Sequence, residues 1–143
     1  MKRGFTIIEL LVVVAIIAVL ASTIIISLDV INARGANTAV QTNLGQIRSE
    51  SLLYREANGG LFLNLCEADS NPYRIRPQLL EACSRAGISG ASCKCFDGED
   101  SWVAAVPLKQ GGGGYAWCVD SNNYGGTITE TRFDMLTSNI LCK

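Results

Sequence analysis

The sequence contains no histidine, and only 17% of its 143 residues are charged. Without histidine the chain lacks the commonest general base and any Ser–His or Cys–His catalytic pair. The four glycines Gly111 to Gly114 are not followed by Lys-Ser/Thr, so they do not form a Walker A loop. A net charge of −1 gives no support to nucleic-acid binding. We therefore expect no enzymatic activity, no small-molecule substrate and no organic cofactor.

Charge is scarcest near the N-terminus, where Glu9 is the only ionisable side chain in residues 5–28. As a helix rising about 1.5 Å per residue, this segment would measure roughly 36 Å, enough to cross a hydrocarbon core of about 30 Å. Lys2 and Arg3 precede it, which favours a cytoplasmic N-terminus and an external C-terminal part. A carboxylate inside such a span costs on the order of 2.5–3.5 kcal/mol at its centre. Two explanations are possible. The helix is only a membrane anchor and the Glu9 side chain reaches the lipid headgroups, or Glu9 has a specific partner.

The residues around Glu9 form a recognisable pattern. Gly4, Phe5 and Glu9 stand in fixed register ahead of an unbroken apolar run, and this stretch resembles the class III signal and N-terminal helix of type IV pilins and pseudopilins. The resemblance implies that residues 1–4 are a leader, that prepilin peptidase cuts between Gly4 and Phe5, and that Phe5 becomes N-methylated. It also implies a lollipop-like subunit held by a single pass in the bacterial cytoplasmic (inner) membrane with its head outside, and later an extracellular or periplasmic filament.

A role for Glu9 follows from that resemblance. Cleavage would give Phe5 a new amine, and Glu9 lies four residues later on the same side of the helix tip. We expect Glu9 of one subunit to pair with the Phe5 amine of a neighbour, because an unpaired charge inside a helix bundle is costly. The implied partners are copies of the chain or other pilins, the prepilin peptidase, and an assembly platform with its ATPase.

Residues 29–57 continue the helix with a different pattern. Apolar or small side chains recur at steps of three and four, which is typical of an amphipathic helix. They are Ala36, Val40, Leu44, Ile47, Ser51 and Tyr54. The sequence predicts one helix from Thr6 to Ala57, ended by Asn58-Gly59-Gly60. We expect its stripe to pack on a core, although a surface for partner helices is the alternative.

Residues 58–143 are predicted to form a small head, so the fold class is α+β, with the long helix packed on a small antiparallel β-sheet. The connector over 61–98 is predicted as loop, apart from a short helix over 77–83. Two strands, 102–108 and 115–120, would form a hairpin across Gly111 to Gly114, with Trp102, Tyr115 and Trp117 packed on the helix. A third strand is predicted over 127–131, followed by a short helical turn.

Six cysteines all lie beyond the apolar run, and an even number in an exported region indicates disulfides. They are Cys66, Cys83, Cys93, Cys95, Cys118 and Cys142. Spacing alone does not determine the pairing, but we expect Cys93 and Cys95 to bond to different partners. A zinc site at Cys93-Lys94-Cys95 is the rival, disfavoured by the absence of histidine and of a CxxC pair.

The head contains one candidate metal site. Some pseudopilins hold calcium in a C-terminal loop, and Asp120, Asn122 and Asp134 offer oxygen ligands of the kind that calcium prefers. Their spacing does not match an EF-hand, and a turn rich in Asn and Ser explains Asp120 to Asn123 without a metal. We expect the turn.

The sequence thus predicts a structural subunit of a type IV pilus or related filament. Two alternatives stay open. The first is a minor pseudopilin of a type II secretion or DNA-uptake system, and the second is a monomeric membrane-anchored binding domain.

Overall fold

The computed structural model describes residues 5–67, 75–88, 92–109, 115–137, 139 and 141–143, without the side chains of residues 23–27. The chain forms two compact units, Met1–Ala33 and Arg34–Lys143. The predicted domain limits at residues 28 and 57 stay predictions.

Helix α1 spans Ile7–Ala57, which agrees with the predicted helix to within one residue at each end. Beyond Ala57 the Gly60 N–H donates to the carbonyl of Arg55 at 2.8 Å, the six-to-one bond of a Schellman-type cap. Gly59 and Gly60 have φ values of 68° and 91°, in the left-handed region where a residue without a Cβ is favoured. The predicted stop of the helix is therefore confirmed.

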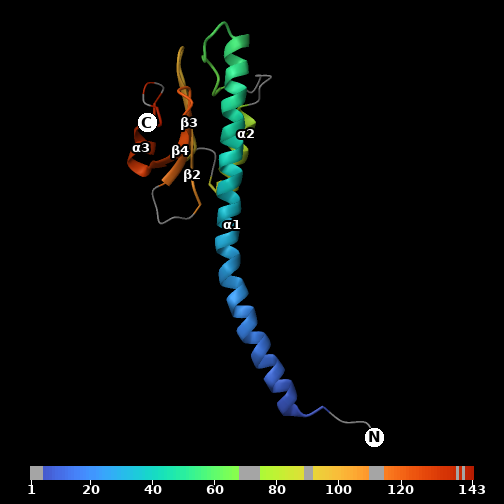
Figure 1. Ribbon diagram of the computed structural model, residues 1–143. Helices are drawn as coiled ribbons and strands as arrows, with labels where there is room; N and C mark the ends of the chain where they lie inside the picture. The colour runs from blue at the N-terminus through green and yellow to red at the C-terminus, as the bar shows by residue number, and fades with distance from the viewer. Residues whose placement is uncertain (1–4, 68–74, 89–91, 110–114, 138, 140) are drawn as a thin grey trace. The chain divides into compact units, whose positions relative to one another are not determined.

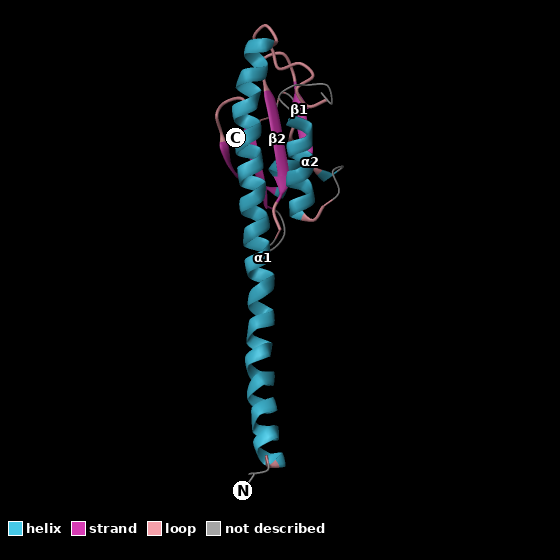
Figure 2. Ribbon diagram, turned by 90° about the vertical axis from the view of Figure 1, so that its right-hand side faces the viewer, coloured by secondary structure: helices cyan, strands magenta, loops and turns pink. Residues whose placement is uncertain are grey.

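The second unit is built on a four-stranded antiparallel sheet in the order β1-β2-β3-β4. Figure 1 labels β2, β3 and β4, and Figure 2 labels β1 beside β2. Its strands are β1 (Lys94–Asp97), β2 (Trp102–Pro107), β3 (Tyr115–Asp120) and β4 (Gly125–Thr129). The central pair, β2 and β3, is the predicted hairpin, with Ala105 opposite Cys118. The glycines predicted to connect them, 111–114, lie outside the described residues.

One face of the sheet packs against α1 and against helix α2, which spans Ile75–Ala86 (Figure 2). From α1 the core receives Val40, Leu44 and Ile47, all with no exposed surface. Trp102 enters from β2 and lies 6.5 Å from the ring of Phe62, centroid to centroid. The predicted stripe thus faces the core of its own unit, and the alternative of a surface for partner helices is wrong for these positions.

The other face of the sheet carries a second, smaller core. Helix α3, Glu130–Met135, and the C-terminal segment after it cover this face. The buried side chains are Val103, Ala105, Ala116, Cys118, Ile128, Leu136 and Cys142. The sheet is therefore covered on both faces. The sequence predicted a cover on one face only, from the long helix.

Three predictions about the head are wrong in detail. The connector over 61–98 is more regular than predicted, because α2 is longer than 77–83 and because β1 pairs along its whole length with β2. The third strand ends at Thr129 rather than at residue 131, since the Thr129 hydroxyl accepts the Arg132 N–H at 3.3 Å and so caps α3. Tyr115 is 52% exposed and does not join the core.

Candidate functional site

The N-terminal tip of α1 is held by a reciprocal pair of hydrogen bonds. Because the helix begins at Ile7, Thr6 is its N-cap and Glu9 its third residue. The Thr6 N–H and hydroxyl both donate to Glu9 Oε2, each at 2.9 Å, and the Glu9 N–H donates back to Thr6 Oγ1 at 3.4 Å. This is a capping box, which satisfies backbone donors that the helix start leaves without partners.

Thr6 is the functional residue that the sequence analysis missed. The pattern Thr6-Ile7-Ile8-Glu9, a Ser/Thr followed three residues later by Glu, is itself the signal for a capping box. The charge of Glu9 in an apolar segment points to a partner outside the helix and does not by itself indicate Thr6. Phe5 precedes this box and is 76% exposed, while Gly4 lies outside the described residues.

The capped tip leads into an apolar surface. Twelve large hydrophobic side chains between Phe5 and Leu20 are each at least 47% exposed in the single chain. Contiguous apolar surface of this extent marks a region that contacts lipid or another protein. Within the described residues, no helical segment meets both the length and the hydropathy of a membrane span. The span predicted over 5–28 includes residues 23–27, whose side chains are not described, so it stays a prediction.

All six cysteines are paired. The disulfides are Cys66–Cys95, Cys83–Cys93 and Cys118–Cys142. Cys93 and Cys95 bond to different partners, which confirms that prediction. With every thiol oxidised, the zinc alternative at Cys93-Lys94-Cys95 is wrong, because zinc binds thiolates.

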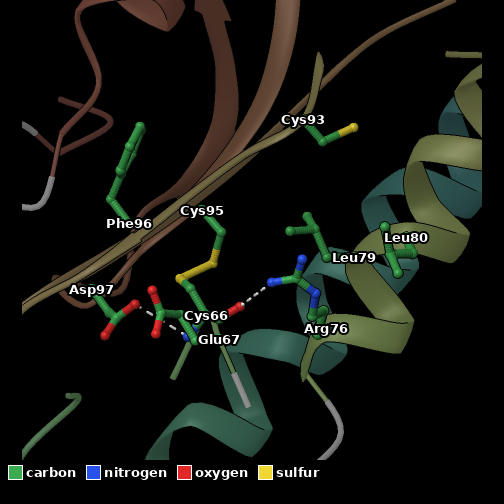
Figure 3. Close-up of a pocket in the computed structure, with 9 residues that line it drawn as sticks. All are labelled: Cys66, Glu67, Arg76, Leu79, Leu80, Cys93, Cys95, Phe96 and Asp97. Atoms are coloured by element: carbon green, nitrogen blue, oxygen red, sulfur yellow. Dashed lines mark hydrogen bonds between the residues drawn. A yellow bond between two sulfur atoms is a disulfide. The ribbon is translucent and has the colours of Figure 1, made fainter. Parts of the chain in front are cut away.

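The Cys66–Cys95 bridge borders a pocket of about 370 Å³ between α2 and β1 (Figure 3). The backbone of Cys66 is fixed on both sides: its N–H donates to Asp97 Oδ1 at 3.2 Å, and its carbonyl accepts from Arg76 Nη1 at 3.2 Å. Glu67 adds a second carboxylate to the lining. Among the described lining residues there is no free thiol, hydroxyl or imidazole, and the ionisable groups are Glu67, Arg76 and Asp97.

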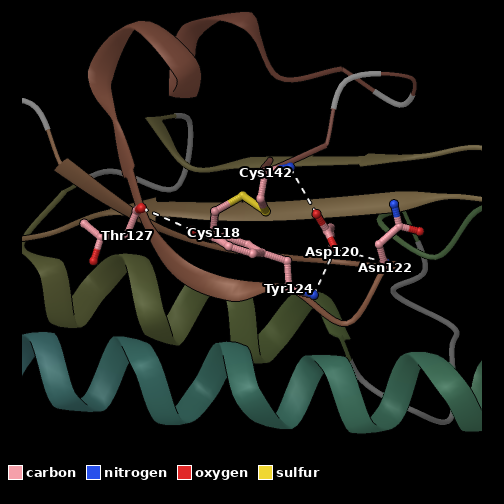
Figure 4. Close-up of a disulfide and its surroundings, with 6 residues drawn as sticks. All are labelled: Cys118, Asp120, Asn122, Tyr124, Thr127 and Cys142. Atoms are coloured by element: carbon pink, nitrogen blue, oxygen red, sulfur yellow. Dashed lines mark hydrogen bonds between the residues drawn. A yellow bond between two sulfur atoms is a disulfide. The ribbon is translucent and has the colours of Figure 1, made fainter.

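The calcium candidates are placed as follows. Asp120 is 1% exposed, and its Oδ1 accepts the N–H groups of Asn122 at 2.9 Å and Tyr124 at 3.2 Å. Its Oδ2 accepts the N–H of Cys142 at 3.1 Å (Figure 4). Asp134 is instead an exposed partner of Lys94, with Nζ and Oδ1 3.7 Å apart.

These contacts make Asp120 the centre of a turn. One carboxylate organises the loop after β3 and also holds the backbone next to the Cys118–Cys142 bridge, and Asn123 adopts a φ of 63° within that loop. In the described part of the chain, no three His, Cys, Asp or Glu side chains come together as a metal would require. Calcium binding is untested by this arrangement.

Comparison with known proteins identifies one segment. Residues 1–25 match the family model described as the prokaryotic N-terminal methylation motif. No curated protein and no solved structure is detectably similar to the chain. The match therefore concerns the capped tip and the apolar surface, and the head is interpreted from its own structure.

Proposed function

We propose that this type IV pilin-like chain, whose N-terminal methylation motif marks the type IV pilin and pseudopilin family, is a structural subunit of a type IV pilus or related filament. Proteins of this kind are generally non-enzymatic and structural. The observation that carries the proposal is the exposed apolar surface of α1 directly after a capped, motif-bearing tip.

The exposed surface indicates what assembly must achieve. Burying a Val, Leu or Ile side chain is worth about 1.5–3 kcal/mol relative to water. Twelve such exposed large side chains therefore represent tens of kcal/mol, which lipid would supply before assembly and neighbouring helices afterwards. In this proposal the chain is processed at the bacterial cytoplasmic membrane, and its head acts outside the cytoplasm.

Processing supplies the charge that assembly uses. Prepilin peptidase removes residues 1–4 and methylates the amine of Phe5. Within the described residues both hydrogen bonds to the Glu9 carboxylate go to Oε2, so Oε1 is available for the amine of a neighbouring subunit. In the proposal, Glu9 thus performs two tasks: it caps its own helix through Oε2 and fixes the register of the next subunit through Oε1.

Three substitutions separate these tasks. Glu9→Ala removes both the cap and the charge, and we expect the protein to stay in the membrane but to enter filaments poorly. Glu9→Gln keeps a side chain that can cap but removes the charge. Thr6→Val keeps the charge and removes the hydroxyl. If the charge pair governs assembly, Glu9→Gln behaves like Glu9→Ala while Thr6→Val assembles; normal filaments from Glu9→Ala would contradict the proposal.

The mature N-terminus tests the proposal at its first step. Mass spectrometry of the protein from its own cells should find a chain that starts at methylated Phe5. An intact Met1 would instead support a monomeric anchored binding domain. Quantification of the chain in purified fibres distinguishes a major subunit from a minor pseudopilin of a secretion or DNA-uptake system.

A further inference from the structure

The sequence contains one Asn-Gly pair, Asn58-Gly59, and it lies directly after the last residue of α1. Both residues are exposed, and nothing lies within 4 Å of the position that a Cβ on Gly59 would occupy. Water therefore has free access to this pair. The pair helps to end the helix, and the filament proposal makes no use of its chemistry.

The backbone N–H of Gly59 is free, whereas those on either side of it are bonded. The Asn58 N–H donates to the Tyr54 carbonyl at 2.8 Å. The Gly60 N–H donates to the Arg55 carbonyl, also at 2.8 Å. Among the described residues, the Gly59 N–H donates to no acceptor. Its nitrogen is therefore available to react with the side chain that precedes it.

The side chain of Asn58 is held by a single long hydrogen bond. Its Nδ2 donates to the Leu61 carbonyl at 3.4 Å, beyond the usual range for a bond from nitrogen to oxygen. This bond must break before the side-chain amide can approach the Gly59 nitrogen. One bond of this kind slows such a step by no more than about tenfold.

Other asparagines are followed by a nitrogen that is already bonded. Asn64 precedes Leu65, whose N–H donates to the Phe62 carbonyl at 3.1 Å. Asn123 precedes Tyr124, whose N–H donates to a carboxylate at 3.2 Å. Each of these following residues also carries a Cβ, which hinders the approach of a side chain to the nitrogen. Asn58 thus differs from them both in sequence and in structure.

We propose that Asn58 is a site of spontaneous deamidation. The Gly59 nitrogen loses its proton to solvent base and attacks Asn58 Cγ, so that a C–N bond forms and the side-chain nitrogen leaves as ammonia. Water then opens the succinimide ring at either carbonyl and gives aspartate or isoaspartate. Asparagine is among the thermolabile residues, and glycine offers the least steric hindrance to the attack. Water is the only other reactant.

The reaction changes the end of α1. Either product places a carboxylate at the C-terminal end of the helix, where negative charge is unfavourable. Isoaspartate also lengthens the backbone by an extra carbon before Gly59, which displaces Gly60 from its bond to the Arg55 carbonyl. A chain that has aged therefore ends its long helix less firmly than a new one.

The test incubates the full chain in detergent micelles under warm, mildly alkaline conditions. Trypsin, used in mildly acidic buffer after reduction of the disulfides, releases residues 56–74, which contain both Asn58 and Asn64. Fragment-ion mass spectrometry then locates the loss of the amide. We expect Asn58 to react at no less than about one tenth of its rate in a synthetic peptide of residues 56–62, while Asn64 keeps its amide. A slower reaction at Asn58, or an equal rate at Asn64, overturns the proposal.

Two variants test the effect on the helix end. Asn58→Gln keeps an amide but must close a larger ring, so it should show no loss of ammonia in the same incubation and should keep the Tm of the fresh protein. Asn58→Asp carries the charge of the product from the start and should melt below fresh wild type. Aged wild type should melt as low as Asn58→Asp or lower, because part of it is isoaspartate. A converted chain whose Tm is unchanged contradicts the weakened helix end.

Discussion

Replacing Asp120 by Asn isolates what one buried carboxylate does for the head. The two side chains have nearly the same shape, so packing is preserved while the charge and one acceptor are lost. An amide can keep its oxygen toward Asn122 and Tyr124. Its NH₂ group then faces the N–H of Cys142, where the native Oδ2 accepts at 3.1 Å. Two donors would therefore meet in a buried position.

The size of the effect follows from these contacts. A hydrogen bond to a charged group is worth about 1.5–3 kcal/mol, and a buried donor left without an acceptor costs a similar amount. One such bond is lost in Asp120→Asn, and the two others weaken as the charge disappears. We expect the free energy of unfolding to fall by about 2–3 kcal/mol, which lowers Tm by roughly 10 °C for a unit of this size.

The assay is unfolding of the full chain in detergent, followed by the fluorescence of Trp102 and Trp117, both of which lie in the head. Asp100→Asn removes an exposed carboxylate and should leave the stability unchanged to within about 0.5 kcal/mol. Added calcium should leave Tm unchanged in both wild type and Asp120→Asn, because the Asp120 oxygens already accept three N–H groups. The reasoning is refuted if Asp120→Asn unfolds like wild type, or if calcium stabilises wild type alone.

Three further predictions concern the Arg34–Lys143 unit. Replacing Cys118 and Cys142 together by Ser opens a bridge across a sequence separation of 24, and should lower the unfolding free energy by about 3 kcal/mol, measured by denaturant titration. Ile47→Ala removes a side chain with no exposed surface and should cost about 2–5 kcal/mol in the same titration. Burial, with a smaller contribution from Asp97, raises the pKa of Tyr54 above its usual value. The contribution of Tyr54 to the free energy of unfolding is therefore complete below about pH 10 and is lost as the pH rises above it. Tyr54→Phe should make the free energy of unfolding, measured by denaturant titration, fall less steeply at alkaline pH.

The parts of the fold that were predictable are those with a regular local pattern. The stripe of α1 repeats at helical spacing, and its end carries two glycines, so both could be derived from the sequence alone. The β2–β3 hairpin follows from two apolar runs, 102–108 and 115–119, on either side of four consecutive glycines. The turn at Asp120 could also be predicted, because Asp, Ser and Asn after a strand form hydrogen bonds to their own backbone.

The parts that were missed depend on contacts between distant residues. Strand β1 has only four residues and follows a stretch with frequent glycine and serine, so its local signal is weak. Pairing with β2 and bridges from both Cys93 and Cys95 stabilise it. The predicted third strand continues to residue 131, whereas β4 ends at Thr129. Thr129 has strand propensity, but here it is the N-cap of α3. The second core involves the C-terminal segment, whose position is fixed by Cys142 and Leu136.

The disulfides have a consequence for a head under mechanical load. A pulling force between the chain ends follows the shortest covalent route, which crosses from Cys66 to Cys95 and from Cys118 to Cys142. These crossings bypass sequence separations of 29 and 24 residues, with Cα–Cα distances of 5.7 and 5.8 Å. At about 3.4 Å per extended residue, the fully stretched chain is thereby shortened by roughly 170 Å. In the oxidised head, the force can therefore extend mainly the segment between Cys95 and Cys118, which contains most of the β2–β3 hairpin. The segments enclosed by the two bridges carry no load even when the chain is stretched.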